Sequence, residues 1–304
     1  MGITMRQMSW ALSQKNTRVL LLLLVVTFLS GCTARKVEAV DTDSVEAVVP
    51  IVTMATLPEG YTPTVLITGA NRGLGLEFTR QYAEMGWNII ATARKPDKAE
   101  ALQALAKQYP GIAIEALDVN DLERVDELSA QYKDQPIDIL LNNAGLSGSP
   151  SPDQLFRRLD YSLFDAYMHT NARGPLKICE AFLSQVRAGQ MKRMVAVSSL
   201  GGSFAARNSM APATTFYRAS KSALNMLMVN VADATKKYGI TVIMLNPGLV
   251  DTQGVLTDMN EKMNMGLNLT LITDSIAGMI NVIDETGIEN TGTIYQWTGE
   301  SLEF

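Results

Sequence analysis

A glycine-rich turn between an apolar run and a helical pattern is the feature that most constrains this chain. The run Val65-Leu66-Ile67 has the character of a buried strand, and apolar residues recur at helical spacing from Leu76 onward. Between them lies Thr68-Gly69-Ala70-Asn71-Arg72-Gly73-Leu74-Gly75. Glycines let the backbone turn tightly and approach a ligand, and a helix N-terminus offers free N–H groups to an anion. The segment therefore predicts a strand, a turn and a helix that bind a dinucleotide diphosphate.

Short apolar runs alternate with helical patterns from residue 63 to residue 304. Short apolar strands separated by helices favour parallel pairing with right-handed crossovers. The predicted fold class is α/β, a single domain with a Rossmann-type doubly wound parallel sheet of about seven strands and helices on both faces. Strands are expected at 65–68, 88–92, 112–117, 137–141, 194–198, 241–246 and 292–296, and helices at 74–85, 97–109, 122–132, 162–187, 213–238 and 273–285.

The composition suits one globular domain that does not bind nucleic acid. Of the 304 residues, 47% are hydrophobic, which is enough for one sizeable α/β core. The net charge is −5, and Lys and Arg are scattered rather than clustered, so there is no sign of a nucleic-acid surface. Two cysteines, Cys32 and Cys179, and a single histidine, His169, argue against a disulfide framework and a zinc site, and no metal is expected.

The N-terminal segment has the features of an exported, lipid-anchored chain. Basic residues precede the apolar run 19–29, which is shorter than the roughly 20 residues that a transmembrane helix needs. The run fits a signal-peptide core. It ends in Leu29-Ser30-Gly31-Cys32, which resembles the lipobox of bacterial lipoproteins, where the chain is cut before the cysteine and that cysteine is lipidated. Residues 1–32 are therefore expected to be a lipoprotein-type signal peptide, with an uncleaved anchor or a chance match as the alternative.

The segment between the signal and the first predicted strand lacks a helical or strand period. Residues 33–62 mix acids with small residues and end in Leu57-Pro58-Glu59-Gly60-Tyr61-Thr62, so they are predicted to be a flexible tether before a domain at 63–304. A lipidated Cys32 would anchor the domain to the membrane at the periplasmic face. Anchoring on the cytoplasmic side stays open.

Tyr217 and Lys221 lie four residues apart within a long helical pattern. At this spacing two side chains share one helix face. A nearby ammonium favours the phenolate, so it would lower the tyrosine pKa towards a value useful for proton transfer. An isolated pair of this kind usually belongs to an ordinary amphipathic helix, so its weight depends on the motifs around it.

Other motifs accompany this pair along the chain. They are the glycine-rich turn, Asn142-Asn143-Ala144-Gly145, Asn171, the strand end Val197-Ser198-Ser199 and Asn246-Pro247-Gly248. On these motifs the chain resembles the short-chain dehydrogenase/reductase (SDR) family over essentially all of residues 63–304. Residues 217–226 and 292–299, together with the early Arg72, look like the sniffer/C-factor type of carbonyl reductase within that family.

The resemblance implies catalytic roles for four residues. Tyr217 would donate the proton to a substrate carbonyl oxygen, and Ser199 would hydrogen-bond that oxygen. Lys221 would bind the nicotinamide ribose and tune Tyr217, and Asn171 would hold a water that links Lys221 to solvent. Ser198 is the alternative to Ser199, although the second serine of the pair matches the family motif.

The resemblance also implies where a nicotinamide nucleotide would lie. The glycine-rich turn would contact its phosphates, the segment after the fourth predicted strand its ribose, and the loop after the sixth its carboxamide. The implied cofactor-binding residues are Gly69, Asn71, Arg72, Gly73, Leu74, Gly75, Arg94, Asp118, Val119, Asn143, Ala144, Gly145, Tyr217, Lys221, Pro247, Gly248, Val250 and Thr252.

The end of the second predicted strand bears on which nucleotide is bound. NAD-specific sites usually place an acid there, to bind the adenosine ribose hydroxyls. Here the strand ends in Ala91-Thr92-Ala93-Arg94-Lys95, without an acid. The planar fork of Arg94 suits a 2′-phosphate, and Arg72 could clamp its other side. The sequence therefore favours NADP(H) over NAD(H).

These expectations predict an NADPH-dependent oxidoreductase that reduces a small-molecule carbonyl, whether ketone, aldehyde or quinone, with Tyr217 as general acid. An alcohol dehydrogenase running in the oxidising direction stays open. A non-catalytic or weakly catalytic cell-surface or signalling protein on the same fold also stays open, because an exported domain has no evident NADPH supply. Relatives often pair through the helices that carry Asn171 and Tyr217, so a homodimer is an alternative to the monomer that the sniffer-like type allows.

Overall fold

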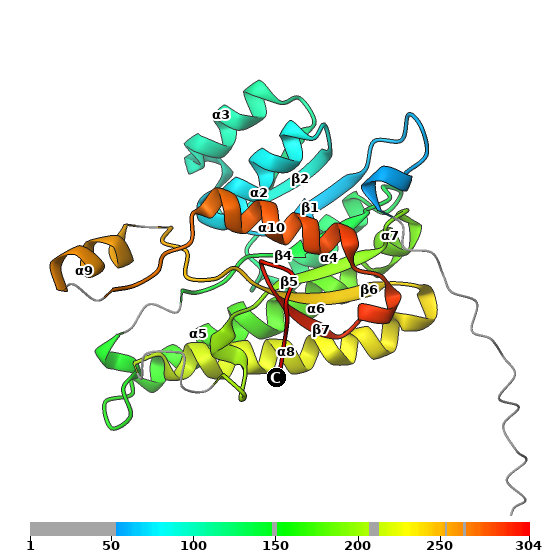
Figure 1. Ribbon diagram of the computed structural model, residues 1–304. Coiled ribbons are helices and arrows are strands. Elements are labelled where there is room, and N and C mark those ends of the chain that lie inside the picture. The colour runs from blue at the N-terminus through cyan, green and yellow to red at the C-terminus, as the bar shows by residue number, and fades with distance from the viewer. Residues whose placement is uncertain (1–52, 148–150, 207–212, 253, 264–265) are drawn as a thin grey trace, which may run out of the picture. The chain divides into compact units, whose positions relative to one another are not determined.

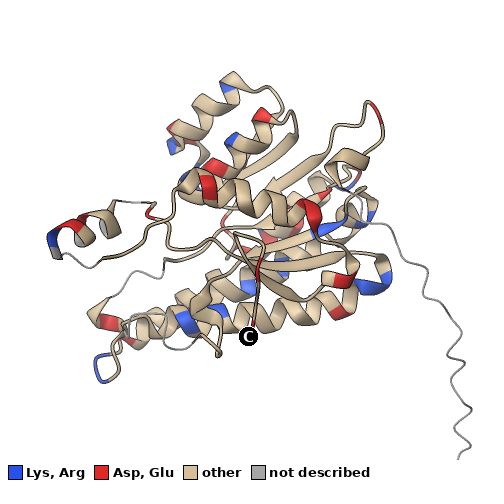
Figure 2. Ribbon diagram, in the orientation of Figure 1, with Lys and Arg blue, Asp and Glu red and all other residues tan. Residues whose placement is uncertain are grey.

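The computed structural model describes the chain from residue 53 onward. The predicted signal peptide, Cys32 and most of the predicted tether lie outside the described residues. Within the part described, no helix is both long and apolar enough to cross a bilayer. Figure 2 shows Lys and Arg interspersed with Asp and Glu over the helices. The described residues are 53–147, 151–206, 213–252, 254–263 and 266–304.

In the described residues, eight strands form one sheet with the order β3-β2-β1-β4-β5-β6-β7-β8. The pairs from β1 to β7 are parallel, and β8 pairs antiparallel with β7. The predicted doubly wound parallel sheet is confirmed, and the short β8 is an addition to it. The strands are β1 (Thr64–Ile67), β2 (Asn88–Ala93), β3 (Ile112–Ala116), β4 (Ile139–Asn142), β5 (Arg193–Val197), β6 (Thr241–Asn246), β7 (Thr293–Gln296) and β8 (Ser301–Leu302).

Helices cover both faces of the sheet (Figure 1). Helices α2, α3 and α10 pack on one face, and α4, α6, α7 and α8 pack on the other. Two layers of helices around one sheet give each face its own core. The helices are α2 (Gly73–Glu84), α3 (Glu100–Gln108), α4 (Leu122–Gln131), α5 (Phe164–Met168), α6 (Gly174–Ala181), α7 (Leu183–Ala188), α8 (Thr215–Thr235), α9 (Val255–Met263) and α10 (Ile272–Glu285).

The alternation of side chains along β1 explains why its sequence is apolar throughout. Val65 and Ile67 enter the core beneath α2 and α10, while Leu66 enters the core beneath α4 and α8. All are fully buried, as expected for a parallel strand covered on both faces. The order of the strands reverses between β1 and β4, and ligands of such sheets bind at the carboxyl ends of the strands at this switch point.

The helix expected at 162–187 is not continuous. It consists of α5, a π-helical turn at His169–Arg173, then α6 and α7. Pro175 lies in the first turn of α6 and has no N–H to donate to the carbonyl four residues earlier. The loss of that bond accounts for a wider turn at this place, which periodicity alone does not reveal.

The end of the predicted tether packs onto the domain. Residues Met54–Thr56 form a 3₁₀ turn, and Met54 and Leu57 lie against the α2/α10 core. The Met54 N–H donates to Asp284 Oδ1 at 2.6 Å, and the Tyr61 hydroxyl donates to Asp138 Oδ2 at 2.9 Å. The packed part of the chain thus begins before residue 63.

Candidate active site

Two glycines in the turn after β1 adopt the left-handed backbone conformation. Gly69 has φ 68° and Gly73 has φ 55°, a region in which other residues are strained. Helix α2 begins at Gly73, and the N-cap residue Arg72 makes no side-chain capping bond. A tight turn followed by an uncapped helix N-terminus leaves N–H groups that can bind a phosphate.

Close packing joins this turn to the segment after β4. A Cβ atom on Gly75 would overlap the Gly69 carbonyl oxygen, and it would lie 2.5 Å from Asn143 Nδ2. Asn143 Nδ2 donates to the carbonyl oxygens of Thr68 and Gly69, at 2.8 and 3.1 Å. Thr68 Oγ1 in turn accepts from the N–H groups of Asn143 and Ala144, each at 3.0 Å. The predicted phosphate and ribose segments therefore meet at the switch point.

Ser199 follows β5, and Tyr217 lies in the first turn of α8. The Ser199 hydroxyl lies within hydrogen-bonding reach of the Tyr217 phenol, an interaction that favours the phenolate. Ser198 points elsewhere, because its hydroxyl donates to Asn225 Oδ1 at 2.5 Å. Of the two serines that the sequence left open, Ser199 is the one beside the tyrosine.

Burial controls the titration of Tyr217 and Lys221. It raises the pKa of Tyr217, with Tyr167 adding to the rise and the hydrogen bond with Ser199 opposing it. It lowers the pKa of Lys221 to about 8. The net pKa of Tyr217 is therefore raised, not lowered as its spacing to Lys221 suggested, because desolvation of the phenolate outweighs the interactions that favour it.

The side chains of Asn171 and Lys221 both approach Gly145. Lys221 Nζ donates to the Val197 carbonyl oxygen at 2.8 Å, and Asn171 Oδ1 accepts from Leu146 N at 2.7 Å. A Cβ atom on Gly145 would lie 3.2 Å from Asn171 Oδ1 and 3.7 Å from Lys221 Nζ. Glycine at this position leaves that space open. Asn171 belongs to the π-helical turn, a feature frequent at functional sites.

The loop after β6 lies against the glycine-rich turn. Gly248 has φ 79°, and the Pro247 carbonyl oxygen accepts a hydrogen bond from α10 at 2.7 Å. Val250 forms an isolated bridge with the segment before α10. Thr252 Cβ lies 3.2 Å from where a Cβ atom on Gly73 would be. This brings the loop that was expected to contact the carboxamide to the same end of the sheet as the other two predicted cofactor segments.

The residues expected around the adenosine lie at the rim. Arg72 and Arg94 are exposed, and neither takes part in an ion pair among the residues described. Asp118 is half-buried, and its Oδ1 accepts from Asn120 N at 3.0 Å, while Val119 is buried. Asn71 and Leu74, the remaining predicted residues of the turn, are both half-buried.

The residues present fit a nicotinamide nucleotide. Positions 73, 75 and 145 carry glycine, and a Cβ atom at any of them would contact neighbouring atoms or occupy space in the site. An uncapped helix N-terminus suits the diphosphate, and two arginines unpaired in the described residues suit a further phosphate. The structure thus brings together the four predicted catalytic residues and the predicted cofactor segments.

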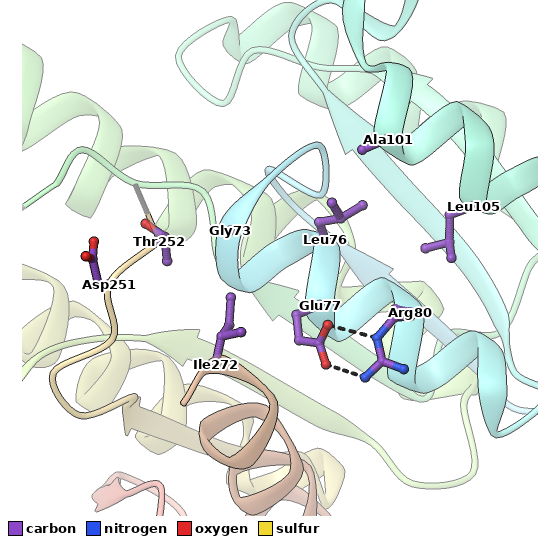
Figure 3. Close-up of a pocket in the computed structure, with 9 residues that line it drawn as sticks. All are labelled: Gly73, Leu76, Glu77, Arg80, Ala101, Leu105, Asp251, Thr252 and Ile272. Carbon is purple, nitrogen blue, oxygen red and sulfur yellow. Dashed lines mark hydrogen bonds and ion pairs between the residues drawn. The ribbon is translucent and has the colours of Figure 1, made fainter. Parts of the chain in front are cut away.

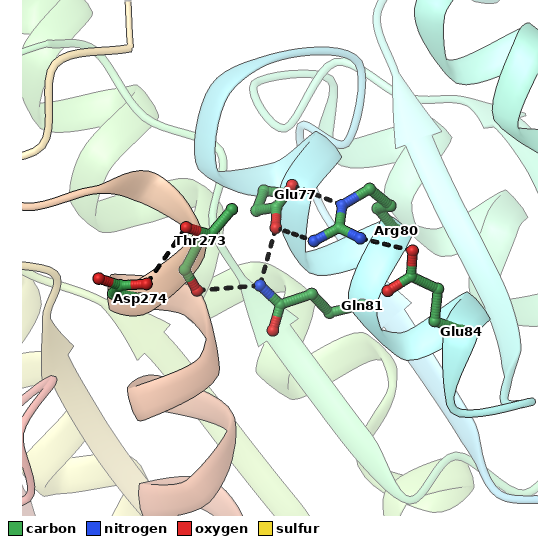
Figure 4. A network of polar contacts seen from close by, with 6 residues as sticks. All are labelled: Glu77, Arg80, Gln81, Glu84, Thr273 and Asp274. Carbon is green, nitrogen blue, oxygen red and sulfur yellow. Dashed lines mark hydrogen bonds and ion pairs between the residues drawn. The ribbon is translucent and has the colours of Figure 1, made fainter.

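A separate cavity of about 390 Å³ lies on the outer side of α2 (Figure 3). It touches the site only at Gly73 and Thr252, and the catalytic residues do not line it. Its wall is fixed by Glu77, which bonds Arg80 and Gln81, and by Gln81 Nε2, which donates to the Thr273 carbonyl oxygen at 3.0 Å (Figure 4). Of these bonds, the one from Gln81 to Thr273 joins α2 to α10. The lining residues are Gly73, Leu76, Glu77, Arg80, Ala101, Leu105, Asp251, Thr252 and Ile272.

Two residues beside the tyrosine were not expected from the sequence. Gln154 is buried and accepts hydrogen bonds at the start of α8, and Tyr167 of α5 influences Tyr217 electrostatically. Gln154 lies in a segment without regular periodicity, and Tyr167 lies in an ordinary helical pattern. Neither position carries a motif, so only the tertiary arrangement identifies them.

Comparison with protein families gives a match to the model described as short chain dehydrogenase, over residues 63–264. Among curated proteins, the C-signal of Myxococcus xanthus is 34% identical over 168 residues, covering 55% of this chain and 92% of that protein.

Solved structures give the same picture. The NADPH-bound carbonyl reductase from chicken fatty liver superimposes with a TM-score of 0.70 at 26% identity, covering 80% of this chain and 94% of that chain. Carbonyl reductase Sniffer of D. melanogaster superimposes with a TM-score of 0.68 at 24% identity, covering 80% of this chain and 100% of that one. The resemblance to this type of protein that the motifs indicated is thereby confirmed.

Proposed function

The chain belongs to the short chain dehydrogenase family, and from this premise we propose that it is an NADPH-dependent reductase of small carbonyl compounds. The observation that carries the proposal is the pairing of Ser199 with Tyr217 next to buried Lys221 and Asn171, at the same end of the sheet as the glycine-rich turn. Ketones, aldehydes and quinones are the substrate classes that this chemistry accepts.

The proposed reaction joins one hydride and one proton to the carbonyl group. NADPH, when bound, supplies the hydride for the carbonyl carbon. Tyr217 donates its phenolic proton to the carbonyl oxygen, and Ser199 holds that oxygen by a hydrogen bond. The products are an alcohol and the oxidised nucleotide, so atoms and charge balance once Tyr217 regains a proton from solvent.

The pKa values of Tyr217 and Lys221 suit reduction of a carbonyl group. A raised pKa keeps Tyr217 protonated at neutral pH, as a proton donor must be. With a pKa of about 8, Lys221 is largely charged at neutral pH, and its cation stabilises the phenolate left after proton transfer. Asn171 supports the return of the proton by holding a water beside Lys221.

The preference for NADPH over NADH rests on three observations. The second strand ends without an acid at the position where NAD-specific sites carry one. Arg94 at that end and Arg72 in the turn are both exposed beside the site. A solved carbonyl reductase with similar structure carries bound NADPH. We take these together as support for a 2′-phosphate contact.

We further propose that the domain is held at a membrane through its N-terminus. The support is the lipobox-like Leu29-Ser30-Gly31-Cys32 after an apolar run, which lies outside the described residues. A periplasmic position would separate the domain from cytoplasmic NADPH. Localisation of the full-length chain by membrane fractionation, with Cys32→Ser as the comparison, tests this part of the proposal.

A signalling role is the second candidate function. It is favoured by the 34% identity to the C-signal of Myxococcus xanthus and by the export signal. A fold shared with enzymes does not fix a catalytic role. Retention of a biological effect in the Tyr217→Phe variant would favour signalling, and its loss would favour catalysis.

The deciding experiment follows NADPH absorbance with the purified chain and a panel of quinones, dicarbonyls and aromatic aldehydes. We expect substrate-dependent oxidation of NADPH by the unaltered chain and a loss of about 10²- to 10⁴-fold in kcat for Tyr217→Phe. Tyr109→Phe, at a half-buried tyrosine outside the site, is the matched control and should retain activity. A folded chain that binds NADPH but turns over none of these compounds would contradict the proposal.

A further inference from the structure

The helix that carries Tyr217 is capped from a distant part of the chain. Helix α8 begins after Thr214, whose side chain makes no capping bond to the helix. The N–H groups of Phe216 and Tyr217, in the first turn, lack carbonyl partners within the helix. Both donate to Gln154 Oε1, each at 3.1 Å. A helix N-terminus that local residues leave uncapped is thus satisfied by a side chain from the segment between β4 and α5.

The contacts of Gln154 fix the orientation of its amide. Its side chain is 1% exposed. Only the amide oxygen can accept from two N–H groups, so Nε2 faces the other way. There it donates to the Tyr167 hydroxyl at 3.0 Å, and that hydroxyl donates to the Ser147 carbonyl oxygen at 3.1 Å. The Thr215 hydroxyl also donates to the main-chain carbonyl oxygen of Gln154, at 2.7 Å.

A second side-chain network holds the carbonyl group of the same residue, Tyr217. The Tyr217 carbonyl oxygen accepts from Ser220 Oγ at 2.7 Å. Ser220 Oγ accepts in turn from Asn171 Nδ2 at 2.9 Å. The backbone of Tyr217 is therefore fixed at its N–H group through Gln154 and at its C=O group through Ser220.

Each network includes one residue from the same face of the segment formed by α5 and the π-helical turn. Tyr167 and Asn171 are four residues apart across α5 and the π-helical turn, a spacing that places two side chains on one side of a helix. Each also bonds the segment after β4, through Ser147 and Leu146 respectively. Helix α5 lies beside the N-terminal part of α8 (Figure 1), so the bonds span a short gap between packed elements.

We propose that Gln154 is a positioning residue for the reductase reaction, which places the Tyr217 hydroxyl against Ser199 by capping α8. The inference rests on the proposed function for its catalytic consequence. Its physical basis is that proton transfer depends steeply on the position of the donor, and a helix start released from its cap can shift. Tyr167 serves as the second support, through the amide of Gln154.

The test uses three variants of the full chain. Gln154→Leu removes both polar contacts at similar volume, and Gln154→Glu keeps the acceptor for the two N–H groups but loses the donor to Tyr167. Gln185→Leu is the matched control, because Gln185 is also buried, at 2% exposed, and its amide bonds Ser129 away from the site. A purely structural role would lower stability in both leucine variants alike.

We expect Gln154→Leu to lower kcat by about 10- to 100-fold, with the Kd for NADPH within about twofold of the unaltered chain. Gln154→Glu should recover most of kcat, and its kcat should persist to higher pH, because a carboxylate near Tyr217 raises the pKa of the phenol. Gln185→Leu should leave kcat unchanged. Equal losses of kcat in the two leucine variants, or no loss in Gln154→Leu, would overturn the inference.

Hydrogen exchange gives a readout that does not depend on turnover. The amides of Phe216 and Tyr217 should exchange slowly in the unaltered chain and markedly faster in Gln154→Leu, while Gln185→Leu leaves them slow. Unchanged exchange in Gln154→Leu would overturn the cap itself. If the unaltered chain reduces no carbonyl, the proposed function fails, and the exchange result alone decides whether Gln154 holds the start of α8.

Discussion

Lys221 Nζ donates a hydrogen bond at 2.8 Å to the carbonyl oxygen of Val197, the last residue of β5. This bond holds the ammonium at the carboxyl end of the central strands, where the site lies. The lysine is 6% exposed, and burial lowers its pKa to about 8, because one carbonyl dipole replaces only part of the hydration that the ammonium loses. The site therefore keeps its cation in place at a cost to stability.

The free-energy cost of burying the Lys221 ammonium predicts that the stability of the folded chain depends on pH. Between about pH 8 and the ordinary lysine value of 10.5, the unfolded chain holds a proton on residue 221 that the folded chain has released. The free energy of unfolding therefore rises with pH in this window, and below it the full penalty applies, about 3 kcal/mol at 1.36 kcal/mol per pKa unit.

Lys221→Met should consequently be more stable than the unaltered chain at pH 7, by about 1–3 kcal/mol after loss of the hydrogen bond to Val197. The difference should shrink as pH rises from 8 to 10. Urea unfolding of both chains without added nucleotide, at several pH values, measures it. A difference that stays constant across this range would contradict the prediction, and the comparison between the two chains cancels the titration of the tyrosines.

Gly75 is predicted to tolerate no side chain. In Gly75→Ala the new methyl group would overlap the Gly69 carbonyl oxygen and crowd Asn143 Nδ2, so backbone must move. We expect a loss of about 3 kcal/mol or more in the free energy of unfolding, with weaker NADPH binding. Gly239→Ala is the control, because Gly239 has φ 71° and open space around it, and should cost only about 1 kcal/mol. Similar costs for both would argue against close packing at Gly75.

The parts of the fold that local patterns encode could be predicted from the sequence. The apolar run of β1 and the glycines after it specify a strand, a turn and a helix start within one short segment, and that segment has the expected structure. Tyr217 and Lys221 could be paired because four residues form about one helical turn. The segments after β4 and β6 could be assigned to the site because parallel strands bring their carboxyl ends together.

Features that depend on distant contacts could not be predicted. Gln154 bonds an N–H group 63 residues further along the chain, and nothing in its local sequence marks it. The short β8 forms only by pairing with β7, since two residues carry no period of their own. The pKa of Tyr217 rises because the fold buries it, whereas spacing alone suggested the opposite effect from Lys221.

Asp138 is predicted to be essential for stability although it lies outside the site. Its carboxylate is fully buried and accepts from Thr64 N and Gln190 N, each at 2.8 Å, and from the Tyr61 hydroxyl at 2.9 Å. An amide at this position would turn its NH₂ group towards N–H donors. Asp138→Asn should therefore lower the free energy of unfolding by about 2–4 kcal/mol.

Asp134→Asn, at an exposed position of the same loop, is the control and should change the free energy of unfolding by less than about 0.5 kcal/mol. Urea unfolding at pH 7 measures both variants. If the two substitutions had equal effects, the network around Asp138 would contribute nothing beyond an ordinary surface carboxylate.

Arg94 is predicted to discriminate between the two nicotinamide nucleotides. It is exposed at the end of β2, where a 2′-phosphate on the adenosine would lie, and the strand end carries no acid to bind ribose hydroxyls instead. Loss of charge-assisted hydrogen bonds to a phosphate costs about 1.5–3 kcal/mol, so Arg94→Ala should raise the Kd for NADPH by about 10- to 100-fold. The Kd for NADH should change little, because that nucleotide offers no phosphate there.

Titration of nucleotide fluorescence with the unaltered chain, Arg94→Ala and the exposed control Arg158→Ala measures both constants. An equal rise in the Kd for both nucleotides would show that Arg94 does not recognise the phosphate.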